Sequence, residues 1–147
     1  MKAAVFKKPG ALLAIEQVAD PEPGPNELVL KVKACGICGT DLHWSQGVDP
    51  TAGWRHLAPG SVMGHEFSGE IVELGKSMNR DYRVGDRVVA QPFIGCGNCI
   101  PCRAGRSYRC SIVATRASPE LTGAYAEYTS IGAAETLRLP DNVTFHA

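Results

Sequence analysis

The sequence predicts a mainly β protein, folded as a closed or nearly closed antiparallel barrel. Sixteen glycines and ten prolines among 147 residues interrupt the chain too often for long helices. Short stretches rich in β-branched residues recur between these turn signals, as they do in all-β folds. Strands and helices do not alternate in the way that builds a parallel sheet. Closure of the sheet would also hide the edge strands from other chains.

Six segments are expected to form the strands. From position 28 to 33, apolar residues at the even positions alternate with Val29, Lys31 and Lys33. This alternation predicts one buried face and one mostly solvated face, as in antiparallel sheets. The segment 21–26 carries three prolines without backbone donors, and it is expected to connect two strands. The expected strands are 3–6, 12–18, 27–34, 66–73, 86–91 and 125–131.

Only two short helical segments are expected. Thr40 is a favourable capping residue for a short helix that runs through His43. Pro101 is suited to the first turn of a helical segment that reaches Ser107.

Composition excludes several partners. Fifteen Lys and Arg balance fifteen Asp and Glu, so the chain lacks the basic excess of a nucleic-acid-binding or membrane-surface protein. The longest apolar run, 11–15, is far shorter than the ~20 residues that span a bilayer. We therefore expect a cytoplasmic globular chain of one domain, with neither nucleic acid nor membrane as a partner.

Four of the six cysteines lie in one short segment. Cys96, Cys99, Cys102 and Cys110 form the pattern C-x2-C-x2-C-x7-C, which suits four thiolates around a structural zinc ion. Such a site is closed, so its role would be to stabilise the loop. Buried thiols, two disulfides or an iron–sulfur cluster are the alternatives, and the first two are disfavoured by the reducing cytoplasm and the dense spacing.

A second group begins with Cys35 and Cys38, whose spacing also occurs in thioredoxin-type redox pairs. The strand–helix alternation of that fold is missing, which disfavours redox chemistry. Cys38 and His65 are instead preferred zinc donors, and Glu66 offers an oxygen ligand. Three protein ligands would leave the open position that a catalytic zinc needs.

Polar residues beside Cys38 have matching roles in such a site. The Thr40 hydroxyl lies two residues away and suits contact with a metal-bound oxygen, while His43 suits proton transfer to water. Asp41 is suited to orient the His65 imidazole by contacting the ring nitrogen that does not bind the metal. The simpler interpretations are a buried cysteine, a capping threonine and a surface histidine.

Taken in order, the segment 38–43, then Gly64-His65-Glu66, then the four-cysteine loop resemble the zinc-dependent medium-chain alcohol dehydrogenases of the polyol, threonine and alcohol dehydrogenase type. The resemblance implies a GroES-like N-terminal catalytic domain, a distorted antiparallel barrel over residues 1–147 with a structural zinc lobe at about 93–116. It implies that Cys38, His65 and Glu66 bind the catalytic zinc and that Thr40 and His43 relay the proton.

The resemblance also implies oxidation of a small-molecule alcohol by hydride transfer to NAD(P). The glycine fingerprint G-x-G-x-x-G of a Rossmann domain is missing: its nearest match, 95–100, lacks the last glycine. We therefore expect a domain truncated before the cofactor domain, without cofactor-binding residues and inactive alone. The alternatives are a stand-alone zinc-binding module that interacts with proteins and a chaperonin-like structural barrel. The alcohol, the choice between NAD and NADP, and a homo-oligomeric state stay open.

Overall fold

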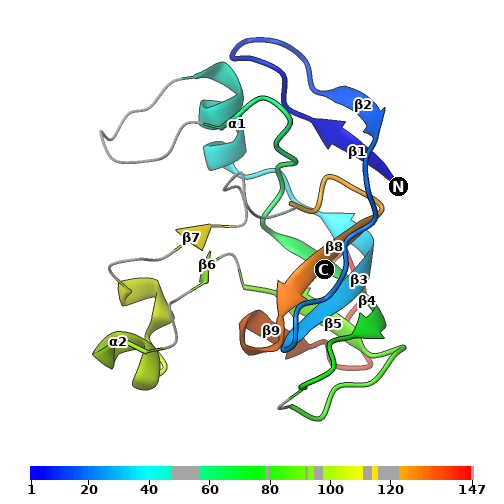
Figure 1. Ribbon diagram of the computed structural model, residues 1–147, viewed down its shortest axis with the longest axis vertical. Coiled ribbons are helices and arrows are strands. Elements are labelled where there is room, and N and C mark those ends of the chain that lie inside the picture. The colour runs from blue at the N-terminus through cyan, green and yellow to red at the C-terminus, as the bar shows by residue number, and fades with distance from the viewer. Residues whose placement is uncertain are drawn as a thin grey trace.

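A curled antiparallel sheet forms the centre of the computed structural model, which describes residues 1–47, 57–78, 80–91, 93–94, 98–110, 114–115 and 123–146. Its strand order is β8-β3-β4-β5-β9, and every neighbouring pair is antiparallel. The sheet bends into a half-barrel (Figure 1), which confirms the expected mainly β class. Its strands are β3 (Glu27–Cys35), β4 (Phe67–Leu74), β5 (Arg87–Ala90), β8 (Tyr128–Gly132) and β9 (Thr136–Arg138).

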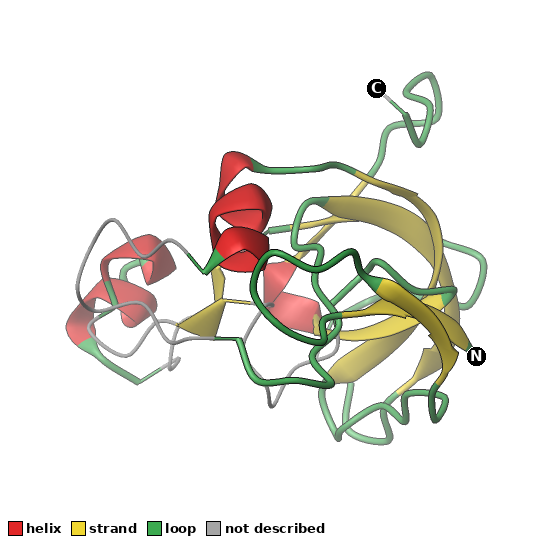
Figure 2. Ribbon diagram, turned by 90° about the horizontal axis from the view of Figure 1, so that it is seen from above, coloured by secondary structure: helices red, strands yellow, loops and turns green. Residues whose placement is uncertain are grey.

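Two smaller sheets accompany the curled sheet. β1 (Lys2–Val5) pairs with β2 (Ala14–Gln17), and isolated bridges join Ala3 to Ala126 and Val5 to Val62. β6 (Phe93–Ile94) pairs with β7 (Ala114–Thr115). This last pair lies with the cysteine-rich segment to one side of the curled sheet in both views (Figures 1 and 2).

The concave face of the curled sheet is packed with apolar side chains. Leu28 and Leu30 of β3 are fully buried, as the alternation predicts, whereas Lys31 and Lys33 are exposed. The expectation for Val29 is wrong, because its side chain is only 4% exposed. The outer face is therefore solvated only from Lys31 onward. The main cluster comprises Leu28, Leu30, Phe67, Ile71, Tyr82, Val88, Ala90, Ala124, Ile131 and Ala133.

Strand boundaries differ from expectation where the backbone bonds elsewhere. The strand expected at 125–131 is β8, which begins only at Tyr128. Tyr125 lies outside it because its amide donates to the Met63 carbonyl at 2.9 Å. The expected strand 12–18 contracts to β2. β6, β7 and β9 were not expected, because segments of two or three residues are too short to show alternation.

The helices are short. α1 (Gly39–Gln46) is capped by Cys38 rather than by Thr40, which lies inside its first turn. α2 (Ile100–Arg103) has a proline at its start, as expected, and the 3-10 turn Ser107–Arg109 follows it. A second 3-10 turn, Ala133–Glu135, joins β8 to β9. Within the described ranges, no helix is long and apolar enough to cross a membrane.

Candidate metal centre

The fold brings Cys38, His65 and Glu66 together. Cys38 lies between β3 and α1, and the other two residues immediately precede β4. One ligand atom from each of the three side chains lies within 4.8 Å of the others. His65 is buried, Cys38 is half-buried and Glu66 is exposed. A thiolate, an imidazole and a carboxylate are all zinc donors, and three protein donors leave one position of a tetrahedral site for a fourth ligand.

Local sequence explains the position of the Cys38 sulfur. Cys38 adopts an extended conformation (φ −85°, ψ 153°) as the residue that caps α1. Its amide donates to Asp41 Oδ2 at 3.0 Å, and its sulfur accepts from the Asp41 amide. Because each residue satisfies the other's backbone N–H, this reciprocal cap holds the thiol at the helix N-terminus.

Asp41 lies directly behind His65. Its Oδ1 is 3.3 Å from His65 Nδ1, and these side chains are 3% and 9% exposed. Among the described residues, neither atom has a well-aligned hydrogen bond, and the two side chains form an ion pair when His65 is protonated. With Nδ1 directed at Asp41, Nε2 is the nitrogen left for a metal. The indole of Trp44 meets the imidazole edge-on, at 5.9 Å between ring centroids.

Tyr125 holds the other side of Asp41, and the sequence analysis did not assign it a role. Its hydroxyl donates to Asp41 Oδ2 at 2.9 Å and also reaches the Gly36 carbonyl oxygen at 3.2 Å. Burial, followed by the neighbouring Asp41, raises the pKa of the Tyr125 phenol, so it stays protonated and donates. Tyr125 is 84 residues from Asp41 in the chain, and no local spacing signals this contact.

The charges of the centre are strongly coupled. Asp41 is the main cause that raises the pKa of His65 to about 9, against the opposing effect of burial. Burial raises the pKa of Asp41, but contacts with His65 and the Cys38 amide outweigh it and leave that pKa below its usual value. The Thr40 hydroxyl is the main cause that lowers the pKa of Cys38. The centre therefore makes the Cys38 thiol more acidic, and a metal must displace a proton from His65.

Thr40 and His43 both lie on α1, which begins directly after Cys38. Thr40 Oγ1 is 3.5 Å from the Cys38 sulfur, so the hydroxyl borders the metal position. His43 follows one helical turn later and is exposed to solvent. Of the two residues expected to transfer the proton, Thr40 therefore contacts Cys38 and His43 is accessible to water.

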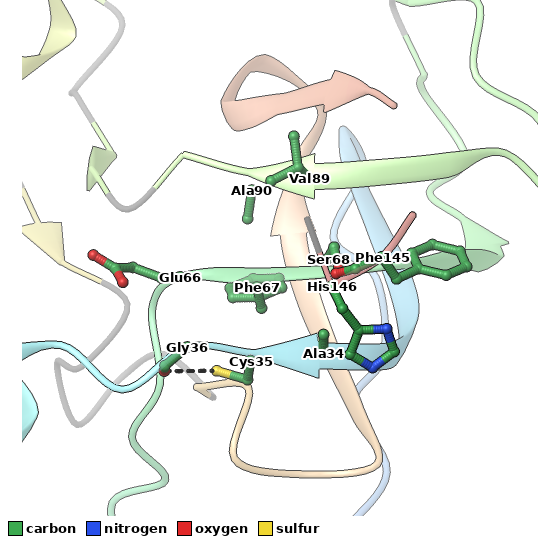
Figure 3. Close-up of a pocket in the computed structure, with 10 residues that line it drawn as sticks. All are labelled: Ala34, Cys35, Gly36, Glu66, Phe67, Ser68, Val89, Ala90, Phe145 and His146. Atoms are coloured by element: carbon green, nitrogen blue, oxygen red, sulfur yellow. Dashed lines mark hydrogen bonds between the residues drawn. The ribbon is translucent and has the colours of Figure 1, made fainter. Parts of the chain in front are cut away.

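Cys35 lies beside the centre as a thiol. Burial is the main cause that raises its pKa to about 12, and its S–H donates to the Gly36 carbonyl at 3.6 Å. A cavity of about 500 Å³ opens next to it, between the ends of β3, β4 and β5 (Figure 3). Phe145 and His146 line this cavity, where the Ser68 hydroxyl donates to the Phe145 carbonyl at 2.6 Å.

A second group of donors lies in the lobe that contains α2. The sulfurs of Cys99, Cys102 and Cys110 lie within 4.8 Å of one another, and the first two are 3.3 Å apart. Cys99 caps α2, and Cys110 is buried after the 3-10 turn. Cys96, the fourth expected ligand, lies outside the described residues. The three converging thiols are three of the four sulfur donors that a four-cysteine zinc site requires.

Comparison with known protein families assigns the chain to one of them. Residues 24–141 match the family model of the alcohol dehydrogenase GroES-like domain. The chain belongs to this family. The resemblance drawn from the motifs at 38–43, 64–66 and 96–110 is thereby confirmed, and a stand-alone interaction module is not favoured.

Relatives of this GroES-like domain are dehydrogenases. The L-threonine 3-dehydrogenase of Xanthomonas campestris pv. campestris (strain B100) is 39% identical over 149 residues, which cover 97% of this chain and 41% of the relative. The L-threonine 3-dehydrogenase of Rhizobium etli is 39% identical over 147 residues, with 98% and 41% covered. The chain thus spans about 41% of the length of these relatives.

Solved structures agree with this assignment. The alcohol dehydrogenase TADH from Thermus sp. ATN1 has a TM-score of 0.84 and 32% identity, covering 99% of this chain and 42% of that one. A dehydrogenase from Sinorhizobium meliloti 1021, assigned as zinc-binding and solved with NADP, has a TM-score of 0.82 and 35% identity, covering 98% and 40%. Zinc and a nicotinamide cofactor are thus associated with this GroES-like domain in related proteins.

Proposed function

We propose that this chain is the catalytic domain of a zinc-dependent dehydrogenase, which oxidises a small alcohol to a carbonyl compound. The observation that carries the proposal is the convergence of Cys38, His65 and Glu66 with Asp41 behind the imidazole. A buried carboxylate aimed at one nitrogen of a histidine is the usual support of a metal-binding imidazole. The match to dehydrogenase relatives supports the same class of reaction.

The catalytic zinc would be held by Cys38, His65 and Glu66. When bound, zinc supplies Lewis acidity, which lowers the pKa of the alcohol hydroxyl. Asp41 keeps the imidazole oriented with Nε2 toward the metal position. The half-buried Cys38 thiolate and the exposed Glu66 carboxylate would complete the set of protein ligands.

Proton transfer is assigned to Thr40 and His43. The Thr40 hydroxyl accepts the proton of the alcohol O–H and passes its own proton toward His43, which delivers it to water. When bound, NAD(P)⁺ would accept the hydride that the carbinol carbon has to lose for the alcohol to become a carbonyl compound. The residues that bind NAD(P) lie outside residues 1–147 in this proposal, because this sequence carries no dinucleotide fingerprint.

A structural zinc is proposed for the lobe at about 93–116. Cys99, Cys102 and Cys110 would bind it together with Cys96, which completes the four-thiolate pattern. Residues 1–147 then form one GroES-like catalytic domain with two zinc sites. L-threonine is the first alcohol to test, since two relatives that are 39% identical to this chain are L-threonine 3-dehydrogenases.

Zinc content per chain tests the proposal. Elemental analysis of the purified chain should give about two zinc ions, and about one in each of the variants Cys38→Ala and Cys99→Ala. An unchanged zinc content in Cys38→Ala would overturn the catalytic site. For the activity itself, NAD(P) reduction by the full-length protein should require L-threonine or another small alcohol, and Cys38→Ala should abolish it.

A further inference from the structure

Tyr125 links the candidate catalytic centre to a distant part of the chain. We propose that Tyr125 is a positioning residue: its hydroxyl holds the Asp41 carboxylate in the one orientation that aims Oδ1 at His65 Nδ1. The inference rests on the proposed function insofar as His65 binds zinc. It adds a residue, 84 positions from Asp41 in the sequence, on which the metal affinity of the centre depends.

The hydrogen bonds of Asp41 explain why a second donor is needed. Oδ2 accepts from the Cys38 amide at 3.0 Å and from the Tyr125 hydroxyl at 2.9 Å. Two donors on one oxygen fix the plane of the carboxylate, and Oδ1 then faces His65 at 3.3 Å. With the Cys38 amide alone, the carboxylate can rotate about its bond to Cβ and carry Oδ1 away from the imidazole.

Tyr125 is itself fixed from three sides. Its amide donates to Met63, the Ala124 amide donates to Gly64, and its carbonyl accepts from the Ala4 amide, at 2.9, 2.9 and 2.7 Å. Its ring crosses the chain at Gly64, where an added Cβ would lie only 2.7 Å from Tyr125 Cδ1. The residue that orients Asp41 is therefore bonded to the same backbone that presents His65.

Removal of one oxygen atom tests the role of Tyr125. Tyr125→Phe keeps the ring and deletes the hydroxyl. The matched control is Tyr82→Phe, which deletes a buried hydroxyl that donates to the Thr136 carbonyl at 2.6 Å, in the main apolar cluster. Zinc binding is measured by chelator competition on each protein and on the same protein with Cys38→Ala. The binding that is lost on Cys38→Ala gives the zinc affinity of the catalytic site. Tyr125→Phe should weaken this affinity about tenfold, and Tyr82→Phe should leave it unchanged.

A double-variant cycle distinguishes positioning through Asp41 from a general loss of structure. In an Asp41→Asn background, Tyr125→Phe should cause no further loss of zinc affinity. An additive loss in that background, an unchanged affinity in Tyr125→Phe alone, or an equal loss in Tyr82→Phe would overturn the proposal.

The orientation of Asp41 can also be measured without metal. In crystals of the zinc-free chain, Tyr125→Phe should turn the carboxylate so that Oδ1 leaves the imidazole, whereas Tyr82→Phe should not. An unchanged Asp41 in Tyr125→Phe would overturn the positioning role. If the chain binds no Cys38-dependent zinc at all, the proposed function fails, and this comparison still decides whether Tyr125 positions Asp41.

Discussion

Asp41 Oδ1 and His65 Nδ1 face each other at 3.3 Å, in a place where both side chains are almost completely buried. Burial of two ionisable groups is costly unless they compensate each other. The fold meets this cost by placing Asp41 in the first turn of α1 and His65 just before β4, so that one charge stabilises the other. A change in this pair is therefore expected to alter the zinc affinity of the centre, the stability of the chain and the dependence of that stability on pH.

Replacement of Asp41 should weaken the catalytic site specifically. Asp41→Asn retains the shape and the acceptor for the Cys38 amide but removes the charge behind His65. Loss of such a partner typically lowers metal affinity 10- to 100-fold, and we expect this for Cys38-dependent zinc in chelator competition. The exposed Asp81→Asn serves as control. Equal affinities in the two variants would contradict the role of Asp41.

Much of the fold could be predicted because one face of the sheet is strongly apolar. Leu28 and Leu30 alternate with polar neighbours, and this pattern indicates an antiparallel strand. Val29 departs from the pattern, since an apolar residue on the outer face can be covered by tertiary contacts that alternation does not reveal. Strands as short as β9, at three residues, leave no periodic signal.

The candidate site was predictable only where its residues are close in sequence. Cys38, Thr40 and Asp41 lie within one turn, and His65 with Glu66 forms a second short motif. Thr40 was assigned as the helix cap because hydroxyl residues favour that position, but Cys38 takes it with help from Asp41. The contact of Asp41 with Tyr125 joins distant segments through the sheet connections, and sequence spacing carries no information about it.

The stability of the zinc-free chain should fall at alkaline pH. Mainly because of Asp41, the folded state raises the pKa of His65 from 6.5 to about 9. The protonated imidazole therefore stabilises the folded state fully below about pH 6.5, and this contribution is lost as the pH rises through about 9. We expect urea unfolding in the presence of a chelator to show a decrease of a few kcal/mol over this range.

A control variant separates this titration from other alkaline effects. Asp41→Asn removes the main cause of the raised pKa, so its free energy of unfolding should change much less between pH 6.5 and 9. A decrease of the same size in this variant would show that His65 is not the responsible group.

The two cysteines near the centre should react at different rates. The Thr40 hydroxyl lowers the pKa of Cys38, whereas burial raises the pKa of Cys35 to about 12. Because the thiolate is the nucleophile, iodoacetamide at neutral pH should modify Cys38 of the zinc-free chain well before Cys35. Peptide mass spectrometry measures both sites in one sample.

Thr40→Val provides the matched variant for this experiment. It keeps a side chain of similar size but removes the hydroxyl 3.5 Å from the Cys38 sulfur, so Cys38 should react more slowly and Cys35 at the same rate. Prior addition of zinc should protect Cys38. Faster modification of Cys35 than of Cys38 would contradict the assignment of their environments.

Gly64 should tolerate substitution far less than Gly85, although both have almost the same φ angle. Their φ angles are +92° and +93°, so an alanine at either position is strained by about 1 kcal/mol or more. At Gly85 the added Cβ meets nothing within 4 Å, whereas at Gly64 it would lie 2.7 Å from the Tyr125 ring and 2.9 Å from the Cys35 sulfur. Overpacking of this kind adds roughly 1–3 kcal/mol.

Urea unfolding of Gly64→Ala and Gly85→Ala therefore reports the cost of crowding Tyr125 and the Cys35 sulfur, because the strain of a positive φ is common to both variants. Gly64→Ala should lose clearly more stability, and it should also lose Cys38-dependent zinc, since a displaced Tyr125 no longer holds Asp41 behind His65. Gly85→Ala should keep its zinc. Equal losses of stability, with zinc retained in both, would mean that the close approach of Tyr125 to Gly64 does not support the metal centre.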